Sequence, residues 1–391
     1  MKRIGFIHVI FPAGGAERVT VDIAEYLTSI GGYEIFVYTA IIDEKLISPK
    51  INSLITIRKT PYEKEKRSAA IEQFIKDDNI DIVVQVVERI HDISGISERT
   101  GCKIVFANHG EPFWQRHSII SRRKHNLLTR FFWKLYLKRI YEKKGKALKL
   151  AIKRYADDYN TCDAYTVLCK AYKTETEKAY GIDPKDSHIY VIENSERAIK
   201  NVCLDKEKII LFSGRLECVS KRIDRLLRIW SKVQYELKDW KLVIVGDGPH
   251  RQLLEKLAAT LKLERYSFEG KTYNMDEYYR RASIVCLVSQ TEGWGLALTE
   301  AQAHGCIPVA FGCTSGVIDI LSPNGINGFV VPPFNEDEYA KTLIKIANME
   351  KAEQEKIRLS AINKRLQYTP DKIGKKYKDL FDTLLESSKT E

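Results

Sequence analysis

The most informative segment of the chain reads Thr291-Glu292-Gly293-Trp294-Gly295-Leu296-Ala297-Leu298-Thr299-Glu300-Ala301. It lies just after Ile284–Val288, an apolar run with the length and composition of a buried strand. The residues from Leu296 to His304 favour a helix, so the two glycines fall in the turn between strand and helix. Strand, glycine turn and helix together form the repeating unit of parallel α/β sheets.

The same alternation runs from end to end of the chain. Apolar runs predict strands at 3–10, 33–39, 80–87, 103–108, 164–168 and 188–192, and again at 209–213, 240–245, 266–269, 284–288, 307–310 and 328–331. Helix-like stretches lie between them, for example 16–28, 223–237, 250–261 and 337–347. The polar stretch 193–206 separates the two sets. We therefore expect an α/β protein with two doubly wound, Rossmann-like domains of about six parallel strands each, facing each other across a cleft.

The expected domains are residues 1–195 and 196–370, followed by a C-terminal helix over 371–391 that packs back on the first domain. A length of 391 residues fits two domains, and 44% apolar with 29% charged residues is typical of a globular protein with sizeable cores. This composition excludes disordered, collagenous and small disulfide-rich classes. No apolar run reaches the roughly 18 residues of a membrane-spanning helix.

The N-terminal sequence and the cysteines indicate in which cellular compartment the protein works. The first apolar run is about eight residues long and enters Gly14-Gly15, which predicts a strand and turn rather than a signal peptide. The eight cysteines include no Cys-x-x-Cys pair and no close histidine at zinc spacing. We expect reduced thiols in a cytoplasmic protein, with no metal site.

Glycines and cations follow several of the predicted strands. Gly14 and Gly15 would let a helix N-terminus approach an anion, although a tight turn alone also explains them. Arg215 and Lys221 follow the strand at 209–213 and could hold a diphosphate from two sides, or they could simply be surface charges. Gly248 lies in a turn after the strand at 240–245. The chain has neither the spacing of a dinucleotide-binding glycine loop nor a P-loop.

The segment 291–301 also has a glycine-containing turn after a predicted strand, and it adds two carboxylates. A phosphate could sit on the backbone N–H groups of Gly295, Leu296 and Ala297 at the start of the helix. Glu292 would then lie in the loop, and Glu300 one turn into the helix. One carboxylate could serve a developing sugar cation and the other a ribose. Each glutamate taken alone is equally explained as a solvated or helix-capping residue.

The pair Glu292 and Glu300, with seven residues between them, resembles the signature of glycosyltransferase family 4, whose members have the GT-B fold. The other pieces of the family pattern occur in order. They are 14–17 (Gly-Gly-Ala-Glu), 213–216 (Ser-Gly-Arg-Leu), Lys221, 245–249 (Val-Gly-Asp-Gly-Pro), 305–309 (Gly-Cys-Ile-Pro-Val) and 325–330 (Gly-Ile-Asn-Gly-Phe-Val). The likeness is dense over 204–334 and thinner but collinear in the first half.

The resemblance implies a retaining hexosyltransferase that uses a nucleotide-diphosphate sugar, with UDP-sugars favoured over GDP-mannose. Arg215 and Lys221 would neutralise the leaving diphosphate, helped by amides at Gly15, Gly295 and Leu296. Glu292 would bind the donor sugar and Glu300 the ribose. We expect no metal or other cofactor, because two cations and a helix dipole can replace Mg²⁺.

The resemblance also gives a role to His109, which follows the strand at 103–108 at the position of the family's histidine near the donor sugar. Glu292 and His109 are thus the expected catalytic residues. The sequence departs from the family pattern at 193–195, where Glu-Asn-Ser replaces an Asn-Gly stretch, and at 218–220, the lead-in to Lys221.

Residues 116–154 form a segment unlike the rest of the chain. It holds 14 Lys and Arg against one Glu, a net charge of +13, whereas the whole chain carries +11. This composition predicts a basic amphipathic helix, or a pair broken near Gly145, that binds an anionic membrane surface. The residues of this expected membrane patch are Arg122, Arg123, Lys124, Arg130, Phe131, Phe132, Trp133, Lys134, Lys138 and Arg139.

The expected enzyme would therefore work on the inner face of the cytoplasmic membrane, on a glycan or lipid-linked acceptor of bacterial surface polysaccharide such as lipopolysaccharide, capsule or exopolysaccharide. The basic segment could instead pack on its own domain. Three other functions remain open: a nucleotide-sugar epimerase or phosphorylase of similar fold, a non-catalytic membrane protein, and a nucleic-acid-binding protein. The last leaves the second half of the chain unexplained, and we expect no nucleic-acid partner.

Overall fold

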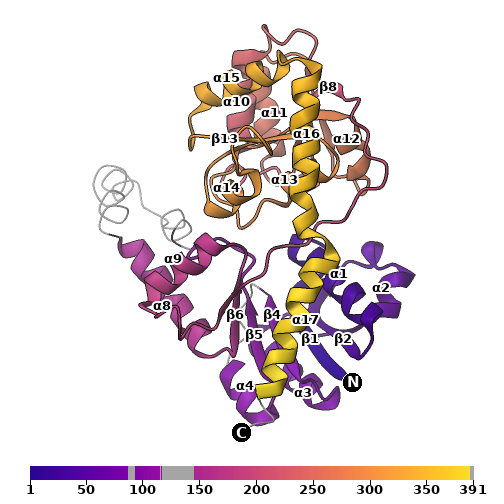
Figure 1. Ribbon diagram of the computed structural model, residues 1–391, viewed down its shortest axis with the longest axis vertical. Helices are drawn as coiled ribbons and strands as arrows, with labels where there is room; N and C mark the ends of the chain where they lie inside the picture. Colours follow the sequence, from indigo (N-terminus) through magenta and orange to yellow (C-terminus); the bar gives the residue numbers. More distant parts are fainter. Residues whose placement is uncertain (87–92, 115, 117–144, 388–391) are drawn as a thin grey trace. The chain divides into compact units, whose positions relative to one another are not determined.

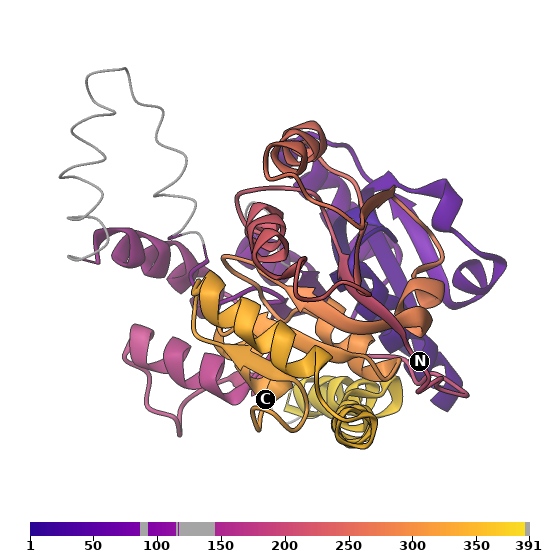
Figure 2. The same ribbon diagram turned by 90° about the horizontal axis from the view of Figure 1, so that it is seen from above.

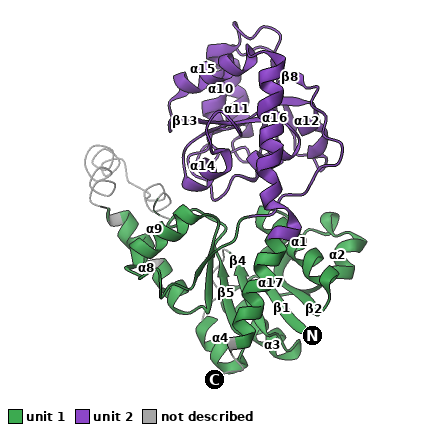
Figure 3. Cartoon of the chain, viewed as in Figure 1, with its two compact units in different colours: residues 1–193, 373–391 green, residues 194–372 purple. Residues whose placement is uncertain are grey.

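The computed structural model describes residues 1–86, 93–114, 116 and 145–387. The described chain divides into two compact units, residues 1–193 with 373–391, and residues 194–372 (Figure 3). Each unit is built around one parallel sheet with helices on both faces (Figures 1 and 2). The predicted pair of parallel-sheet α/β domains is therefore confirmed.

The sheet of unit 1 has the order β3-β2-β1-β4-β5-β6-β7 in the described residues. Its strands are β1 (Lys2–Phe11), β2 (Tyr33–Ile42), β3 (Ile55–Lys59), β4 (Ile82–Val86), β5 (Lys103–Ala107), β6 (Ala164–Val167) and β7 (Ile189–Val191). Its helices are α1 (Gly15–Ile30), α2 (Pro49–Leu54), α3 (Lys64–Asp77), α4 (Ile93–Thr100), α8 (Lys146–Asn160) and α9 (Lys170–Tyr180), with a 3₁₀ turn at Glu44–Leu46. The strand order reverses between β1 and β4, which defines the switch point of a doubly wound sheet.

Strand β3, at one edge of this sheet, is not among the predicted strands. Its residues alternate between apolar and polar or charged side chains, and it pairs only with β2. A short strand of this kind carries little apolar signal, because one of its faces and one of its edges remain outside the core.

Alternate residues of each central strand enter different cores. In β1, Ile4 and Phe6 pack on the side covered by α1, whereas Ile7 packs on the side covered by α3 and α4. The core on the α1 side also receives α17 (Pro370–Ser387), which contributes Ile373, Tyr377, Leu380, Phe381 and Leu384. The last helix of the chain is thus part of unit 1.

The sheet of unit 2 has the order β10-β9-β8-β11-β12-β13, again with parallel neighbours. Its strands are β8 (Glu207–Ser213), β9 (Lys241–Val245), β10 (Tyr266–Gly270), β11 (Ala282–Leu287), β12 (Ile307–Phe311) and β13 (Phe329–Val331). Its helices are α10 (Ile223–Val233), α11 (Arg251–Thr260), α12 (Met275–Arg281), α13 (Leu296–Ala303), α14 (Ser315–Leu321), α15 (Glu336–Ala347) and α16 (Lys351–Arg365), with a 3₁₀ turn at Leu366–Tyr368. The order reverses between β8 and β11, so the loops after these strands border the switch point.

Candidate active site

The loop after β8 is organised by a buried carboxylate, that of Glu217. Its Oε1 accepts the backbone N–H groups of Ser220 at 2.9 Å and Lys221 at 3.2 Å, and also the Ser220 hydroxyl. Its Oε2 lies 3.2 Å from Nη2 of Arg215, whose side chain is 67% exposed. Burial alone would raise the pKa of Glu217, but the Ser220 and Lys221 hydrogen bonds and the Arg215 charge outweigh it and lower the pKa. One ionised carboxylate therefore positions both cations of this loop.

The loop after β11 brings Glu292 to the same place. Nζ of Lys221 lies 2.6 Å from Oε1 of Glu292, and the Ser289 hydroxyl donates to the same oxygen at 2.6 Å. The Glu292 side chain is only 10% exposed and that of Lys221 is 30% exposed. This charge-assisted pair places a carboxylate and an ammonium side by side at the switch point.

A second set of contacts ties the two loops together through their backbones. The N–H of Gln290 donates to the carbonyl of Ser220 at 2.6 Å. Arg225, buried in α10, donates to the carbonyl of Val288 at 3.2 Å and to Oε1 of Gln290 at 2.5 Å. Its burial lowers the Arg225 pKa to about 10, still well above neutrality. The loops that carry Lys221 and Glu292 are thus joined to each other by hydrogen bonds.

Helix α13 starts directly beyond Glu292. Gly295 caps it in a left-handed conformation with φ of 91°, which a residue with a Cβ adopts only at a cost. Leu296 is the first helical residue, so the backbone N–H groups of the first helical turn follow Gly295 directly. The geometry is the one that the sequence predicts for an anion-binding helix start.

Glu300 lies on the second turn of α13 and is held by α12. The Tyr279 hydroxyl donates to Oε2 of Glu300 at 2.6 Å and lies 2.6 Å from the hydroxyl of Ser213, the last residue of β8. Glu300 is therefore connected to the strand that leads into Arg215.

Gly248 has a packing role in the structure. A Cβ there would lie 2.5 Å from the carbonyl oxygen of Leu216, and one at Gly246 would lie 1.9 Å from that of Gly214. The backbone of the loop after β9 thus packs directly on the Arg215 loop, where the N–H of Leu216 donates to the carbonyl of Asp247 at 2.9 Å.

In unit 1, Gly14 and Gly15 form the turn between β1 and α1. Gly14 has φ of 133°, and a Cβ there would lie 2.2 Å from Oε2 of Glu17. Glu17 in turn faces the buried His8, with 3.4 Å between Oε1 and Nδ1. The positive φ of Gly14 therefore favours glycine at this position, whereas the Glu17 carboxylate lies at the end of a flexible side chain that could move aside.

His109 follows β5, at the carboxyl edge of the same sheet. The preceding Asn108 fixes the local backbone, because its Oδ1 accepts the N–H of Gly110 at 3.0 Å and its Nδ2 donates to Tyr165 at 3.1 Å. His109 itself is half-buried.

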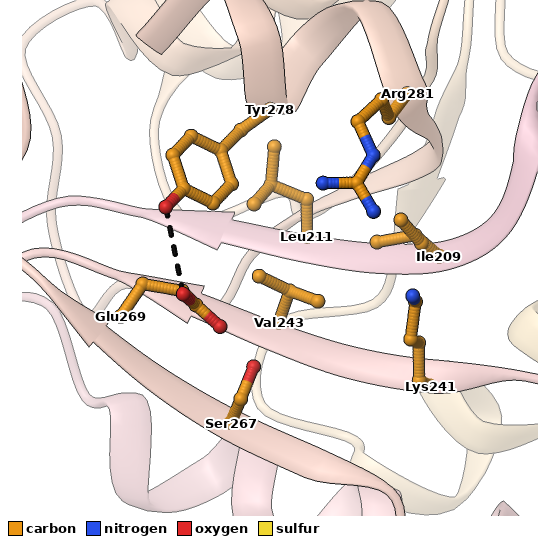
Figure 4. A pocket seen from close by; sticks show the side chains of 8 residues that line it. All are labelled: Ile209, Leu211, Lys241, Val243, Ser267, Glu269, Tyr278 and Arg281. Atoms are coloured by element: carbon orange, nitrogen blue, oxygen red, sulfur yellow. Dashed lines mark hydrogen bonds between the residues drawn. The ribbon is translucent and has the colours of Figure 1, made fainter. Parts of the chain in front are cut away.

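A pocket of about 130 Å³ in unit 2 lies away from these residues (Figure 4). Its floor is apolar, and Tyr278 and Arg281 of α12 project over it. Arg281 and Lys241, its two cations, lie 2.6 and 3.6 Å from the carboxylate of Glu207 and share it as an ion-pair partner. None of the predicted site residues lines this pocket.

Comparison with known proteins identifies the family. The family model described as "Glycosyl transferases group 1" matches residues 194–363, and the one described as "Glycosyltransferase Family 4" matches residues 13–195. An uncharacterized glycosyltransferase of Haemophilus influenzae is 30% identical over 89% of this chain and 91% of its own length. This chain belongs to glycosyltransferase family 4. It is a glycosyltransferase of the GT-B type.

More distant similarities agree with this assignment. A Campylobacter jejuni N-acetylgalactosaminyltransferase, named for a diNAcBac-PP-undecaprenol-linked acceptor, is 24% identical over 91% of each chain. The crystal structure of Anabaena HepE with UDP and glucose has a TM-score of 0.73 over 98% of this chain and 100% of that one. At 15% identity, this likeness supports the GT-B fold alone.

The structure brings together several of the residues predicted for a family 4 donor site. Lys221 and Glu292 are in contact, Arg215 lies in the same loop as Lys221, and Gly295, Leu296 and Glu300 follow in the adjoining turn and helix. Gly14, Gly15 and His109 lie in the other unit. The roles of all these residues in the glycosyltransferase remain predictions.

Sequence reasoning missed Glu217 and Tyr279. Glu217 is the one acidic residue between Gly214 and Lys221. Its place between two cations in the sequence could have indicated an ion pair within this loop. Nothing in the sequence could point to Tyr279, since it reaches Glu300 across 21 positions of the chain.

The predicted membrane patch lies outside the described residues. Of the segment 116–154, the structure describes Arg116 and the part from Gly145 onward. Gly145 has a left-handed backbone conformation, and α8 starts at the next residue. Within the described ranges, no helix combines the length and the apolar character needed to cross a membrane.

Proposed function

We propose that this glycosyltransferase moves a hexosyl group from a nucleotide-diphosphate sugar to a glycan or lipid-linked acceptor, with retention of the anomeric configuration. The observation that carries the proposal is the cluster of Arg215, Lys221 and Glu292 on rigid loops at the switch point of unit 2. Ligands of doubly wound sheets bind at this position. Two cations suit a diphosphate, and a carboxylate beside them suits sugar hydroxyls.

The chemistry follows from where charge develops. The bond between the anomeric carbon and the donor phosphate oxygen breaks, and the acceptor oxygen bonds to the same carbon. The acceptor proton passes to the leaving phosphate oxygen, so no protein base is required. Arg215, Lys221 and the first amides of α13 stabilise the departing diphosphate, which is the dominant contribution expected for such a step.

Glu292 and His109 would serve the donor sugar in this scheme. Glu292 is fixed by Lys221 and Ser289, so it can accept hydrogen bonds from the sugar without reorganising. Glu300 would bind the nucleotide ribose. Gly14 and Gly15 would contribute amides from unit 1, and Gly248 would contribute by shaping the loop of Arg215.

Relatives inform the choice of substrates. The resemblance to the family favours a UDP-sugar over GDP-mannose, and the undecaprenol-linked acceptor in the Campylobacter enzyme's name favours a lipid-linked glycan of a bacterial surface polysaccharide. The +13 segment 116–154 would hold the enzyme on the anionic inner face of the cytoplasmic membrane. Failure of the full chain to bind phosphatidylglycerol vesicles at low salt would contradict this location.

A donor screen tests the activity. Purified enzyme is incubated with a panel of UDP- and GDP-sugars, and release of the nucleotide diphosphate is measured with and without lipid-linked acceptors. We expect turnover of at least one donor, and on the order of a 100-fold loss or more in Glu292→Ala. Glu255→Ala is the matched control, since Glu255 forms an exposed ion pair with Arg251.

The same screen separates the alternatives. An epimerase would convert the sugar without releasing nucleotide, and a phosphorylase would require inorganic phosphate. Near-normal turnover in Glu292→Ala would remove the role assigned to that residue. The absence of turnover with every donor would contradict the proposal.

A further inference from the structure

Tyr279 is a fully buried side chain whose hydroxyl meets two polar groups, one at the end of strand β8 and one on helix α13. Its Oη lies 2.6 Å from Oε2 of Glu300 and 2.6 Å from Oγ of Ser213. A phenol has one proton, and an ionised carboxylate can only accept. Tyr279 therefore donates to Glu300, and Ser213 donates to Tyr279.

The ring of Tyr279 is itself fixed from several directions. It stacks on the ring of His304, with 5.2 Å between centroids and 26° between planes. The backbone carbonyl of Tyr279 accepts from the ammonium of Lys206 at 3.0 Å and from the thiol of Cys306 at 3.0 Å. Its hydroxyl thus has little freedom to move.

Lys206 also joins the two helices involved. Its ammonium donates to Arg280 O at the end of α12, at 2.8 Å, and to His304 O just after α13, at 2.7 Å. Helices α12 and α13 are consequently tied together twice, once at their carboxyl ends and once through Tyr279 and Glu300. The distance between the Tyr279 ring and the Glu300 backbone is set by this arrangement.

We propose that Tyr279 is a positioning residue for nucleotide recognition, which fixes the carboxylate of Glu300 in the orientation that binds the ribose hydroxyls. This inference rests on the proposed function, in which Glu300 contacts the ribose. A glutamate has several rotatable bonds, and holding one oxygen removes the cost of ordering them when nucleotide binds. Ser213 extends the connection to β8 and so to the loop of Arg215.

The inference makes a prediction specific to the ribose. Tyr279→Phe would keep the stacking on His304 and the buried volume, and would remove only the hydroxyl. Nucleotide affinity should then fall only because the contact between Glu300 and the ribose hydroxyls weakens. The diphosphate contacts of Arg215 and Lys221 should stay intact. A nucleotide without ribose hydroxyls should be insensitive to the substitution.

The test is isothermal titration of the full chain with UDP and GDP, each compared with its 2′,3′-dideoxy counterpart. The variants are Tyr279→Phe, Glu300→Ala and the matched control Tyr339→Phe. Tyr339 is equally buried in the same unit, and its hydroxyl donates at 2.6 Å to the backbone carbonyl of Val309, away from Glu300. Thermal unfolding of each variant measures the loss of stability separately.

We expect Glu300→Ala to weaken binding of the ribonucleotide about tenfold or more and Tyr279→Phe about three- to tenfold. Neither substitution should change binding of the dideoxy compound, and Tyr339→Phe should change neither affinity. If Glu300→Ala shows a ribose-specific loss and Tyr279→Phe does not, the positioning role is overturned. If Glu300→Ala shows no ribose-specific loss, or if neither nucleotide binds the wild type, the proposed function of the site fails first.

Discussion

Lys221 and Glu292, which are 71 residues apart in the sequence, form an ion pair with 2.6 Å between Nζ and Oε1. The two residues belong to loops after β8 and β11, the strands on either side of the switch point in unit 2. The ammonium of Lys221 thus has a carboxylate partner within the protein. A diphosphate that binds here must share Lys221 with Glu292.

This sharing predicts opposite effects of two substitutions. Lys221→Ala should weaken UDP binding on the order of tenfold or more, because a charge-assisted contact is lost. Glu292→Gln should preserve or tighten UDP binding, since the ammonium no longer has a competing anion, while sugar transfer falls sharply. Titration calorimetry and initial rates measure the two properties. Equal losses of UDP affinity in both variants would show that Lys221 and Glu292 do not compete in this way.

Glu217 should matter for both stability and binding, because its carboxylate holds the backbone at Lys221 and the side chain of Arg215. We expect Glu217→Ala to lower the melting temperature by about 2–6 °C and to weaken UDP binding. Glu217→Gln keeps an acceptor for the backbone and should cost less stability. Differential scanning calorimetry and titration give both values. A Glu217→Ala protein with wild-type affinity would limit this residue to a structural role.

Gly374 of α17 packs against the side chain of Tyr26 in α1. A Cβ there would lie 2.4 Å from ring atoms of Tyr26, so the contact has no room for a methyl group. We expect Gly374→Ala to destabilise unit 1 by roughly 1–3 kcal/mol, the range typical of overpacking. The neighbouring exposed Lys375→Ala is the control. Urea unfolding measures the difference, and equal midpoints for the two variants would mean that α17 shifts freely to accommodate the methyl group.

Asp382 couples the docking of α17 to pH. Burial raises the pKa of its carboxyl, but hydrogen bonds from Lys2, Lys378 and Tyr33 outweigh burial and bring the pKa down to about 2. The pKa is depressed in the folded state, so the stabilisation is complete above the unfolded value of about 3.9 and is lost as pH falls toward 2. Because the side chain is partly solvated, we expect a contribution on the order of 1 kcal/mol.

Asp382→Asn tests this pH dependence. The free energy of unfolding of the variant should lie below that of the wild type at pH 7, and the gap should narrow between about pH 4 and pH 2. Urea titrations at several pH values measure it. A gap that stays constant with pH would mean that the charge of Asp382 contributes nothing to α17 docking.

Much of the architecture could be read from periodicity. The runs at 209–213 and 284–288 predicted β8 and β11 to within a few residues, since strands buried on both faces are almost continuously apolar. The edge strand β3 could not be predicted because only Ile55 and Ile57 of its five residues face a core. The spacing of Glu292 and Glu300, together with glycines and cations after strands, identified the family.

The sequence by itself determined the two parallel sheets, the family and the types of residue that follow the strands, because periodicity and loop chemistry are local properties of the chain. Only the tertiary structure decided which of those residues meet. The contacts of Lys221 with Glu292, and of Tyr279 with Glu300 and Ser213, depend on the order of strands in the sheet and on how helices pack against it. Such contacts join positions far apart in the sequence, so no local pattern could reveal them.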